Sequence, residues 1–311
     1  MSTPLLLDTD PGCDDALAIV FALEHADIDL VGLTSIFGNA PTADTTRNAR
    51  SILELFDRTD VPVAAGADEP LLADLDTAEH IHGPGGIKGD LPDPTPATEP
   101  VDAHAAQFIV DQAREHGSDL TLAAVGRLTN VALALALEPD LPDLLDEILI
   151  MGGSAFEAGN VSPLASANFY GDPHAARRVV RDTDPTMVPL DVTQYSGLPA
   201  SWIDALPRDT PRSAAVYEWA TYYSDDDLDR YGIETAAIHD AMALASLVDD
   251  DLLETEAHFL EVGADAGLAQ GALAVDLQGT RGEKANGRVA LGVDAERYQD
   301  IVTETIDRAL D

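Results

Sequence analysis

The stretch that decides the fold is residues 4–18, PLLLDTDPGCDDALA. Its apolar start, residues 4–8, predicts a short buried strand, and residues 14–26 predict a helix that follows a sharp turn at Pro11 and Gly12. A continuously apolar strand that leads directly into a helix is typical of a parallel sheet covered on both faces. The stretch also places four aspartates within eight positions. Carboxylates this close repel one another unless a positive charge lies between them.

Outward from this stretch, apolar runs alternate with helical patterns along most of the chain. The next predicted strands are residues 28–36, 61–66, 119–126, 147–153 and 186–193, with helices at 42–57, 102–116, 128–138 and 172–182. Beyond residue 194 we expect helices at 199–206, 211–224, 239–249 and 295–310, and strands at 256–262, 271–277 and 288–293. The alternation predicts a single α/β domain over residues 1–311, with an open, twisted, mostly parallel sheet of mixed edge and helices on both faces. Residues 72–100 are expected to form a long active-site loop, and residues 195–238 a helical segment near the site.

The charge of the chain is strongly negative. It has 57 acidic and 17 basic residues, a formal net charge of −40 at pH 7, and its two lysines are Lys88 and Lys284. Binders of nucleic acid or of anionic membranes need the opposite sign, so we expect neither partner. The acids are scattered through the sequence, which we interpret as the solvated surface of a halophile's protein, where salt screens self-repulsion.

The cysteine content and the apolar runs bound the protein further. Cys13 is the only cysteine, which excludes an intramolecular disulfide and a cysteine zinc cluster. No apolar run is long enough to span a bilayer, and the first residues lack the pattern of a secretion signal. We therefore expect a cytoplasmic protein.

Polar residues follow the predicted strands at their carboxyl ends, where open α/β sheets bind ligands. Asp10, Asp14 and Asp15 come after the first strand, Asn39 after the second, and Asp240 lies at the start of a later helix. A helix dipole contributes only about 0.3–1 kcal/mol per charge, which is too little to hold three converging carboxylates together. The available ligands are hard oxygens, so the pattern indicates Ca²⁺ or Mg²⁺ rather than zinc.

The segment DTDPGCDDALA (8–18) resembles the N-terminal signature of the inosine-uridine nucleoside hydrolases, calcium-dependent enzymes that hydrolyse N-ribosides. The similarity recurs in order along the chain, in VPVAAGADEPL (61–71), IHGPGG (81–86), VGRLTNVALAL (125–135), ILIMGGSAFEAGN (148–160), SANFYGDPHAA (166–176), VPLDVT (188–193) and AIHDAMALA (237–245). So many segments in register make this the family that the sequence favours. The resemblance implies hydrolysis of a small-molecule ribonucleoside to ribose and free base, by a homodimer or homotetramer.

Position by position, the resemblance implies a role for each matching residue. Calcium ligands would be Asp10, Asp15, Asp240 and the backbone carbonyl of Val125, with Asp10 also acting as general base for a calcium-bound water. Substrate-binding residues would be Asp14 and Asn39 at the ribose 2′- and 3′-hydroxyls, Asn168 at the sugar and Asn160 at the 5′-hydroxyl, together with Met151, Ser166 and Tyr231. His239 would face the leaving base as a catalytic residue, and His82 would lie on a mobile loop beside it. Cleavage of an N-riboside builds positive charge on the sugar, which carboxylates stabilise, while a histidine can protonate the departing base near neutral pH.

Several of these residues also have structural alternatives. Asp10, Asp14 and Asp15 could cap a helix, as could Asp240, and Asn39 could be an ordinary turn residue. For His239 the alternative is a structural histidine, and for His82 the two interpretations are evenly balanced. Tyr222, Tyr223 and Tyr231 precede the helix of His239, where they could stack on the base or pack the core.

Two positions depart from the family pattern. Ser166 stands where the family usually has a glutamate that holds the 5′-hydroxyl, so an alternative substrate is a 5′-modified ribonucleoside or nucleotide. Arg127 stands where the family usually has proline, and we expect little effect from it.

Three rival functions remain as alternatives. One is a haloacid-dehalogenase type phosphatase, which Asp8 and Asp10 would suit but which lacks a lysine in the required context. Another is a relative that binds nucleosides or ribose without turnover, and the third is a purely structural acidic protein. The sequence does not distinguish purine from pyrimidine substrates, because base contacts come from loops.

Overall fold

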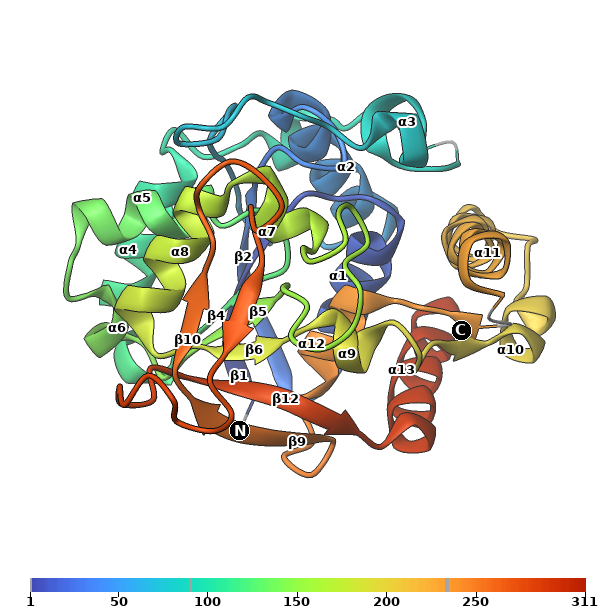
Figure 1. Ribbon diagram of the computed structural model, residues 1–311. Coiled ribbons are helices and arrows are strands. Elements are labelled where there is room, and N and C mark those ends of the chain that lie inside the picture. The colour runs from blue at the N-terminus through green and yellow to red at the C-terminus, as the bar shows by residue number, and fades with distance from the viewer. Residues whose placement is uncertain (1, 90, 233–234) are drawn as a thin grey trace.

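The computed structural model describes residues 2–89, 91–232 and 235–311, without the side chains of residues 226–231. An eight-stranded sheet lies at its centre (Figure 1). In spatial order its strands are β3 (Val63–Ala65), β2 (Ile28–Ser35), β1 (Thr3–Thr9), β4 (Thr121–Ala124), β5 (Glu147–Met151), β6 (Thr186–Val188), β12 (Gly287–Val293) and β9 (Leu253–His258). All neighbouring pairs are parallel except β12 and β9, which pair antiparallel. The predicted single α/β domain with a mostly parallel sheet and a mixed edge is therefore confirmed.

Strand β1 shows why the sheet needs cover on both faces. Leu5, Leu6 and Leu7 are all fully buried. Because successive side chains of a strand point to opposite faces, Leu5 and Leu7 enter one hydrophobic cluster and Leu6 enters another. The apolar run that predicted this strand thus fills two cores at once.

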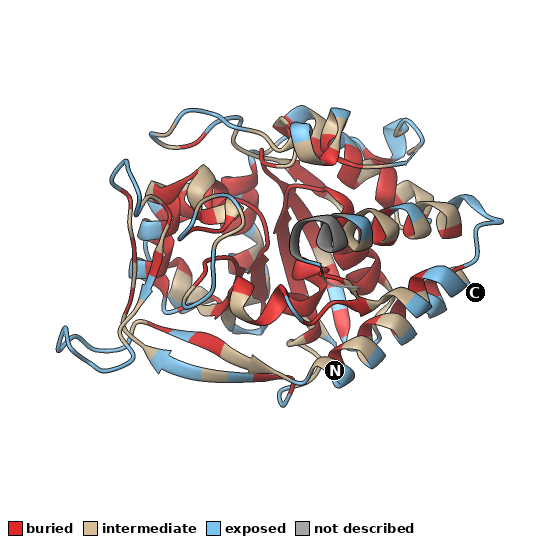
Figure 2. Cartoon of the chain, turned by 45° about the vertical axis from the view of Figure 1, so that its right-hand side comes forward, coloured by how far each residue is buried: buried red, intermediate tan, exposed pale blue. Residues whose placement is uncertain are grey.

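Helices supply that cover. The longer ones are α1 (Cys13–Glu24), α2 (Thr42–Leu55), α4 (Ala105–His116), α5 (Thr129–Leu137), α8 (Pro173–Thr183), α11 (Pro211–Tyr231), α12 (His239–Ala245) and α13 (Ala295–Leu310). Buried residues of α1, α2, α11, α12 and α13 share the cluster of Leu5, and those of α4, α5 and α8 share the cluster of Leu6. Figure 2 shows the buried sheet at the centre and exposed residues on the outer sides of the helices.

The remaining elements are short and lie mostly in the connections. They are α3 (Glu79–His82), α6 (Leu141–Leu144), α7 (Ala167–Gly171), α9 (Leu190–Thr193), α10 (Ala200–Ala205) and three 3₁₀ turns at Pro84–Gly86, Pro96–Thr98 and Gly117–Asp119. Two small antiparallel pairs complete the fold, β7 (Leu198–Pro199) with β8 (Thr235–Ala236) and β10 (Leu260–Val262) with β11 (Leu273–Val275).

Three predicted segments need correction. The strand predicted at 186–193 ends at Val188, because the chain turns at Pro189 into the single helical turn of α9. The strand predicted at 256–262 is two strands, β9 and β10, which belong to different sheets. The segment 195–238 is helical in its middle but includes the short strands β7 and β8, which pair with each other.

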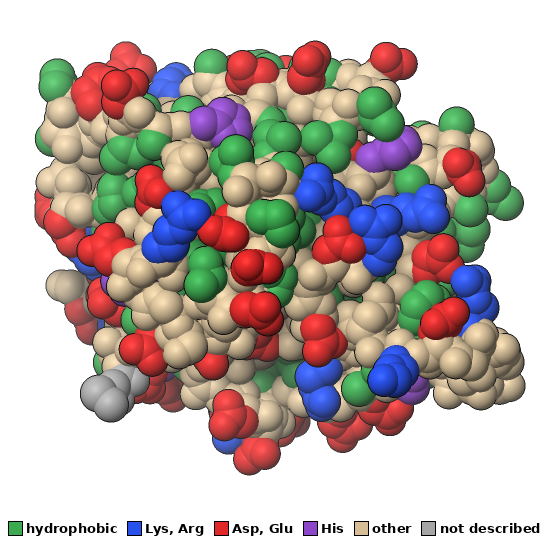
Figure 3. Space-filling model, turned by 90° about the vertical axis from the view of Figure 1, so that its left-hand side faces the viewer, with side chains coloured by type: hydrophobic (Ala, Val, Ile, Leu, Met, Phe, Trp, Pro, Cys, Tyr) green, Lys and Arg blue, Asp and Glu red, His purple; other side chains and the backbone are tan. Residues whose placement is uncertain are grey.

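The surface carries the acidic excess of the sequence. On the face drawn in Figure 3, aspartate and glutamate side chains are spread among fewer arginines and lysines rather than gathered in one patch. Within the described ranges, no helix has both the length and the apolar character that crossing a bilayer requires.

Candidate active site

A cavity of about 570 Å³ lies beyond the carboxyl ends of the central strands. Asp10 follows β1, Asn39 follows β2, Val125 follows β4 and Met151 ends β5, and all four residues line the cavity. This is the place where open parallel sheets bind ligands. Of the predicted site residues, Asp14, Asp15, His82, Asn160, Ser166, Asn168, His239 and Asp240 also line it. The side chain of Tyr231 lies outside the described part of the chain.

The turn between β1 and α1 is organised around the carboxylate of Asp15. Its Oδ1 accepts hydrogen bonds from Thr9 Oγ1 at 2.5 Å and from the backbone N–H of Asp10 at 3.1 Å. Its Oδ2 accepts from the Gly12 N–H and from Asn39 Nδ2, each at 3.0 Å. Gly12 is required here, because a Cβ at this position would lie 2.5 Å from Asn39 Nδ2. The turn therefore fixes the acidic motif against the loop that follows β2.

Three carboxylates meet at the floor of the cavity. One oxygen from each of Asp14, Asp15 and Asp240 lies within 4.8 Å of the others, and all three residues are buried. Asp240 reaches this group because α12 packs against α1. Burial, reinforced by the neighbouring Asp15, raises the pKa of Asp14 to about 8, and burial also raises the pKa of Asp240 well above its ordinary value. Three buried carboxylates can all be charged only beside a cation, and their hard oxygens suit calcium or magnesium. The group therefore fits a divalent metal ion.

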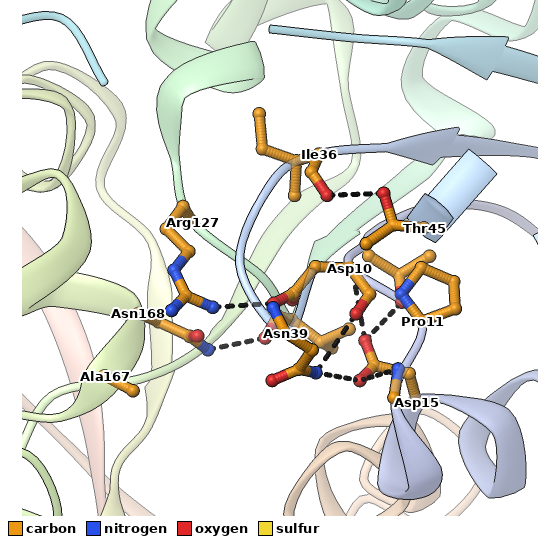
Figure 4. A network of polar contacts seen from close by, with 12 residues as sticks. Asp10, Pro11, Asp15, Ile36, Asn39, Thr45, Arg127, Ala167 and Asn168 are labelled. Carbon is orange, nitrogen blue, oxygen red and sulfur yellow. Dashed lines mark hydrogen bonds and ion pairs between the residues drawn. The ribbon is translucent and has the colours of Figure 1, made fainter. Parts of the chain in front are cut away.

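Asp10 lies outside this group, although the resemblance implied that it is a metal ligand. Its Oδ2 accepts hydrogen bonds from the backbone N–H of Asn39 at 2.8 Å and from Arg127 Nη1 at 2.6 Å (Figure 4). Asn39 Nδ2 also donates to the backbone carbonyl of Asp10 at 3.0 Å. Burial and the Asp15 charge raise the pKa of Asp10, whereas the Arg127 charge lowers it. The structure thus places Asp14 in the carboxylate group and holds Asp10 beside it.

A second wall of the cavity is built from polar residues after β4 and β5. Asn168 Nδ2 donates to the backbone carbonyls of Val125 at 2.5 Å and of Met151 at 3.1 Å. The Asn160 carbonyl oxygen accepts from the Ala167 N–H at 2.9 Å. Ser166 Oγ accepts from the Gly153 N–H at 2.7 Å. These bonds fix the wall, and the amide of Asn168 occupies one lone pair of the Val125 carbonyl that the resemblance assigns to the metal.

Aromatic rings form the opposite wall. The ring of His82 lies 5.5 Å from Tyr222 and 6.3 Å from Tyr223, and Tyr223 lies 6.1 Å from His239. Tyr223 also hydrogen-bonds to Asp14. His239 Nδ1 pairs with Thr193 Oγ1 at 2.7 Å, and burial lowers the pKa of His239 to about 4, so the imidazole is neutral at pH 7. The rings offer flat apolar surfaces next to a neutral histidine, as a heterocyclic base would require.

Comparisons with known proteins identify the family of the chain. The family model for inosine-uridine preferring nucleoside hydrolases matches residues 5–300. The chain belongs to this family. The hydrolase is 36% identical over 310 residues to the pyrimidine-specific ribonucleoside hydrolase RihA of Escherichia coli O7:K1. The aligned region covers 98% of this chain and 99% of the relative.

Solved structures of nucleoside hydrolases have the same fold as this hydrolase. A plant nucleoside hydrolase superposes with a TM-score of 0.90 at 29% identity, over 98% of this chain and 99% of that chain. A purine-preferring ribonucleoside hydrolase from Gardnerella vaginalis also gives 0.90, at 30% identity over 98% of each chain. The predicted family, fold class and enzyme class, an N-glycosyl hydrolase acting on ribonucleosides, are therefore confirmed.

The loop that covers the cavity of this hydrolase is shorter than the sequence predicted. Residues from Leu72 to His82 line the cavity, whereas none of the described residues between 83 and 100 does. Its first part, residues 72–77, is held at both ends, because the Leu71 N–H donates to Asp172 Oδ2 at 2.8 Å and the Ala78 N–H donates to the Gly38 carbonyl at 2.9 Å. Farther along, the Tyr222 hydroxyl donates to the Ile81 carbonyl at 3.0 Å, which joins α3 to α11.

Sequence reasoning missed the part that Arg127 plays in the hydrolase. The residue was expected to have little effect, yet its guanidinium forms a buried ion pair with Asp10. A signal was available, because this is a basic residue directly after an inner strand, at the carboxyl edge of the sheet, in a chain with few cations. Thr193, which orients His239, was also missed, and it sits in the segment taken for the end of a strand.

Proposed function

We propose that this nucleoside hydrolase cleaves the N-glycosidic bond with Asp10 as the general base, calcium as the cofactor and His239 as the group that assists the departing base. The observation that carries this proposal is the buried, hydrogen-bonded position of Asp10 at the floor of the cavity, directly beside three further carboxylates. A base in this place can take the proton of a water that lies between it and the sugar.

The cation would be held by the group of Asp14, Asp15 and Asp240, with Asp10 and the Val125 carbonyl beside it as the ligands that the resemblance suggests. Calcium, when bound, would neutralise these carboxylates and lower the pKa of a nearby water. Asp14 and Asn39 line the cavity close to this group, which supports their predicted role in holding the ribose hydroxyls.

The electrostatics of the site suit the transition state of this reaction. Loss of the base leaves positive charge on the ribose, and the buried carboxylates around Asp10 stabilise it. His239 is neutral at pH 7, and in the tautomer whose Nδ1 accepts from the Thr193 hydroxyl, its Nε2–H would donate a hydrogen bond to the leaving base. His82, Tyr222 and Tyr223 would pack against that base.

The substrate is proposed as an ordinary ribonucleoside such as inosine or uridine. Relatives of similar identity carry opposite preferences, pyrimidine for RihA and purine for the Gardnerella vaginalis enzyme, so identity does not select the base. We further propose a homodimer or homotetramer, on the resemblance alone.

A second candidate substrate is a 5′-modified ribonucleoside or nucleotide. Ser166 lines the cavity as a short neutral side chain whose Oγ already accepts from the Gly153 N–H, so its hydroxyl hydrogen is available to a ligand. Asp74 and Asp76 also line the cavity, and their charges disfavour a phosphate.

The test is a set of initial rates of ribose release in concentrated KCl, with added calcium or with EDTA. Inosine, uridine, cytidine and adenosine report the base preference, and 5′-deoxyinosine and inosine 5′-monophosphate report the 5′ preference. We expect turnover of nucleosides that EDTA abolishes and calcium restores, and almost none in Asp10→Asn. Full turnover in EDTA would exclude the metal, wild-type turnover in Asp10→Asn would exclude this base, and a strong preference for plain inosine would exclude the second candidate.

A further inference from the structure

Arg127 places a buried positive charge in the active site. It follows β4, its guanidinium Nη1 lies 2.6 Å from Asp10 Oδ2, and its side chain is 6% exposed against 3% for Asp10. Among the described residues that line the cavity, it is the only arginine or lysine. A buried ion pair is costly unless geometry and hydrogen bonds compensate, so such a pair at a reaction centre calls for a functional explanation.

The surrounding backbone is shaped to admit this pair. A Cβ on Gly38 would lie 1.9 Å from Asp10 Oδ2 and 2.1 Å from Arg127 Nη1. A Cβ on Gly171, in a distant part of the chain, would lie 2.8 Å from Arg127 Nε. Gly38, in the loop after β2, and Gly171, at the end of α7, therefore make the slot in which the guanidinium and the carboxylate meet.

The pair also orients the carboxylate. Asp10 Oδ2 receives both the Arg127 guanidinium and the Asn39 N–H, whereas Oδ1 lies against Gly126, where a Cβ would come within 2.5 Å of it. Nε of Arg127 has no acceptor within the described part of the chain, so the ion pair to Asp10 is the contact that defines this side chain's place. One carboxylate oxygen is thus fixed by two donors and the other is left for a water.

We propose that Arg127 is a positioning residue, which holds Asp10 by Oδ2 so that Oδ1 stays turned to the cavity, where the cation and the attacking water would lie. This inference rests on the proposed role of Asp10 as general base.

The balance of charges in the site is consistent with this role. The four aspartates bring four negative charges, and Arg127 with a divalent cation brings three positive ones. One negative charge remains to meet the single positive charge that grows on the ribose. Without Arg127 the site loses a positive charge, so binding of the metal is not weakened, whereas Asp10 is no longer held in place and proton removal slows.

The test compares Arg127→Gln and Arg127→Lys with Arg114→Gln. This control removes a half-exposed arginine paired with Glu138, and neither residue of that pair lines the cavity. Three quantities are measured for each variant: kcat and KM for the best nucleoside, the calcium dissociation constant by calorimetry, and Tm. In Arg127→Gln we expect kcat to fall by about 10- to 100-fold, since misplacement of a reacting group by about 1 Å costs up to that much. We expect KM and the calcium dissociation constant to rise less than about threefold, and Arg127→Lys to recover part of kcat. Arg114→Gln should match the wild type.

The double variant Asp10→Asn with Arg127→Gln separates positioning from direct action. If Arg127 acts through Asp10, the double variant is no slower than Asp10→Asn alone. A kcat within about twofold of wild type in Arg127→Gln, a clearly slower double variant, or loss of calcium binding would each overturn the inference. If Arg127→Gln does not fold, the kcat of Arg127→Lys is the deciding measurement. A wild-type kcat in Arg127→Lys would show that the planar guanidinium is not needed to hold Asp10, and would overturn the inference. Wild-type activity of Asp10→Asn, in contrast, would overturn the proposed function itself.

Discussion

Removal of the cation should make the stability of this hydrolase fall as pH rises, because of Asp14. Burial raises the pKa of this carboxyl from 3.8 to about 8 in the folded protein. A folded pKa above the unfolded one stabilises the protein at low pH, and that contribution is lost as pH rises through the folded pKa. At about 1.36 kcal/mol per pKa unit, the free energy of unfolding of the cation-free protein falls by about 4 kcal/mol between about pH 5 and about pH 8.5. A bound cation keeps Asp14 charged at both pH values, so the loaded protein does not lose this amount.

The assay is thermal unfolding in constant KCl, with excess calcium or with EDTA, at those two pH values. An unfolding entropy of about 2.1 cal/mol/K per residue converts 4 kcal/mol into about 6 °C of Tm for 311 residues. The rise in Tm on adding calcium should therefore be about 6 °C larger at the higher pH. Asp14→Asn should remove most of this difference, whereas Asp250→Asn, which removes an exposed acid of equal charge, should keep it. A calcium-induced rise that is equal at both pH values, or absent, would refute the reasoning.

Three further substitutions test the site. Gly38→Ala would put a Cβ 1.9 Å from Asp10 Oδ2 and 2.1 Å from Arg127 Nη1, so the initial rates of ribose release should fall by about 100-fold. Unchanged rates would show that the position of the Asp10–Arg127 pair does not depend on the space left by this glycine. His239→Ala should lower kcat on nucleosides by about 10²- to 10⁴-fold but far less on a nitrophenyl riboside, whose leaving group needs no proton; an equal loss on both would remove the leaving-group role. Burial lowers the pKa of His239 from 6.5 to about 4, so its stabilising contribution is present above about pH 6.5 and is lost as pH falls to 4. Denaturant unfolding of His239→Asn should therefore show about 3 kcal/mol less acid destabilisation than wild type over this range, and an identical pH dependence would show that the ring is not neutral when folded.

The parts of the fold that the sequence predicted are those set by local pattern. Each inner strand is an unbroken apolar run that ends in turn residues, and Leu5, Leu6 and Leu7 show why, since both faces of the sheet are covered. The site followed from the same pattern, because polar residues after parallel strands meet at one edge. The segment after Val188 was misassigned because an apolar run of this length does not reveal where Pro189 turns the chain.

The parts that the sequence could not predict depend on contacts between distant residues. The orientation of Asp10 is set by donors that lie 29 and 117 residues away, Asn39 and Arg127. Which aspartates lie closest together therefore depends on hydrogen bonds that no local spacing encodes, and Asp14 lies with the predicted ligands Asp15 and Asp240. The extent of the covering loop was overestimated for a similar reason, because composition does not tell which part of a polar segment faces a cavity.

The covering loop has a consequence that follows from how its ends are held. The Leu71 and Ala78 amides are fixed by Asp172 and by the Gly38 carbonyl, groups that belong to the scaffold, while the six residues between them touch no catalytic carboxylate through a described hydrogen bond. That short span can be exchanged, lengthened or reshaped without moving the machinery beneath it. Grafting this span from relatives of other preference would therefore change part of the cavity lining while its two anchoring hydrogen bonds to the scaffold remain.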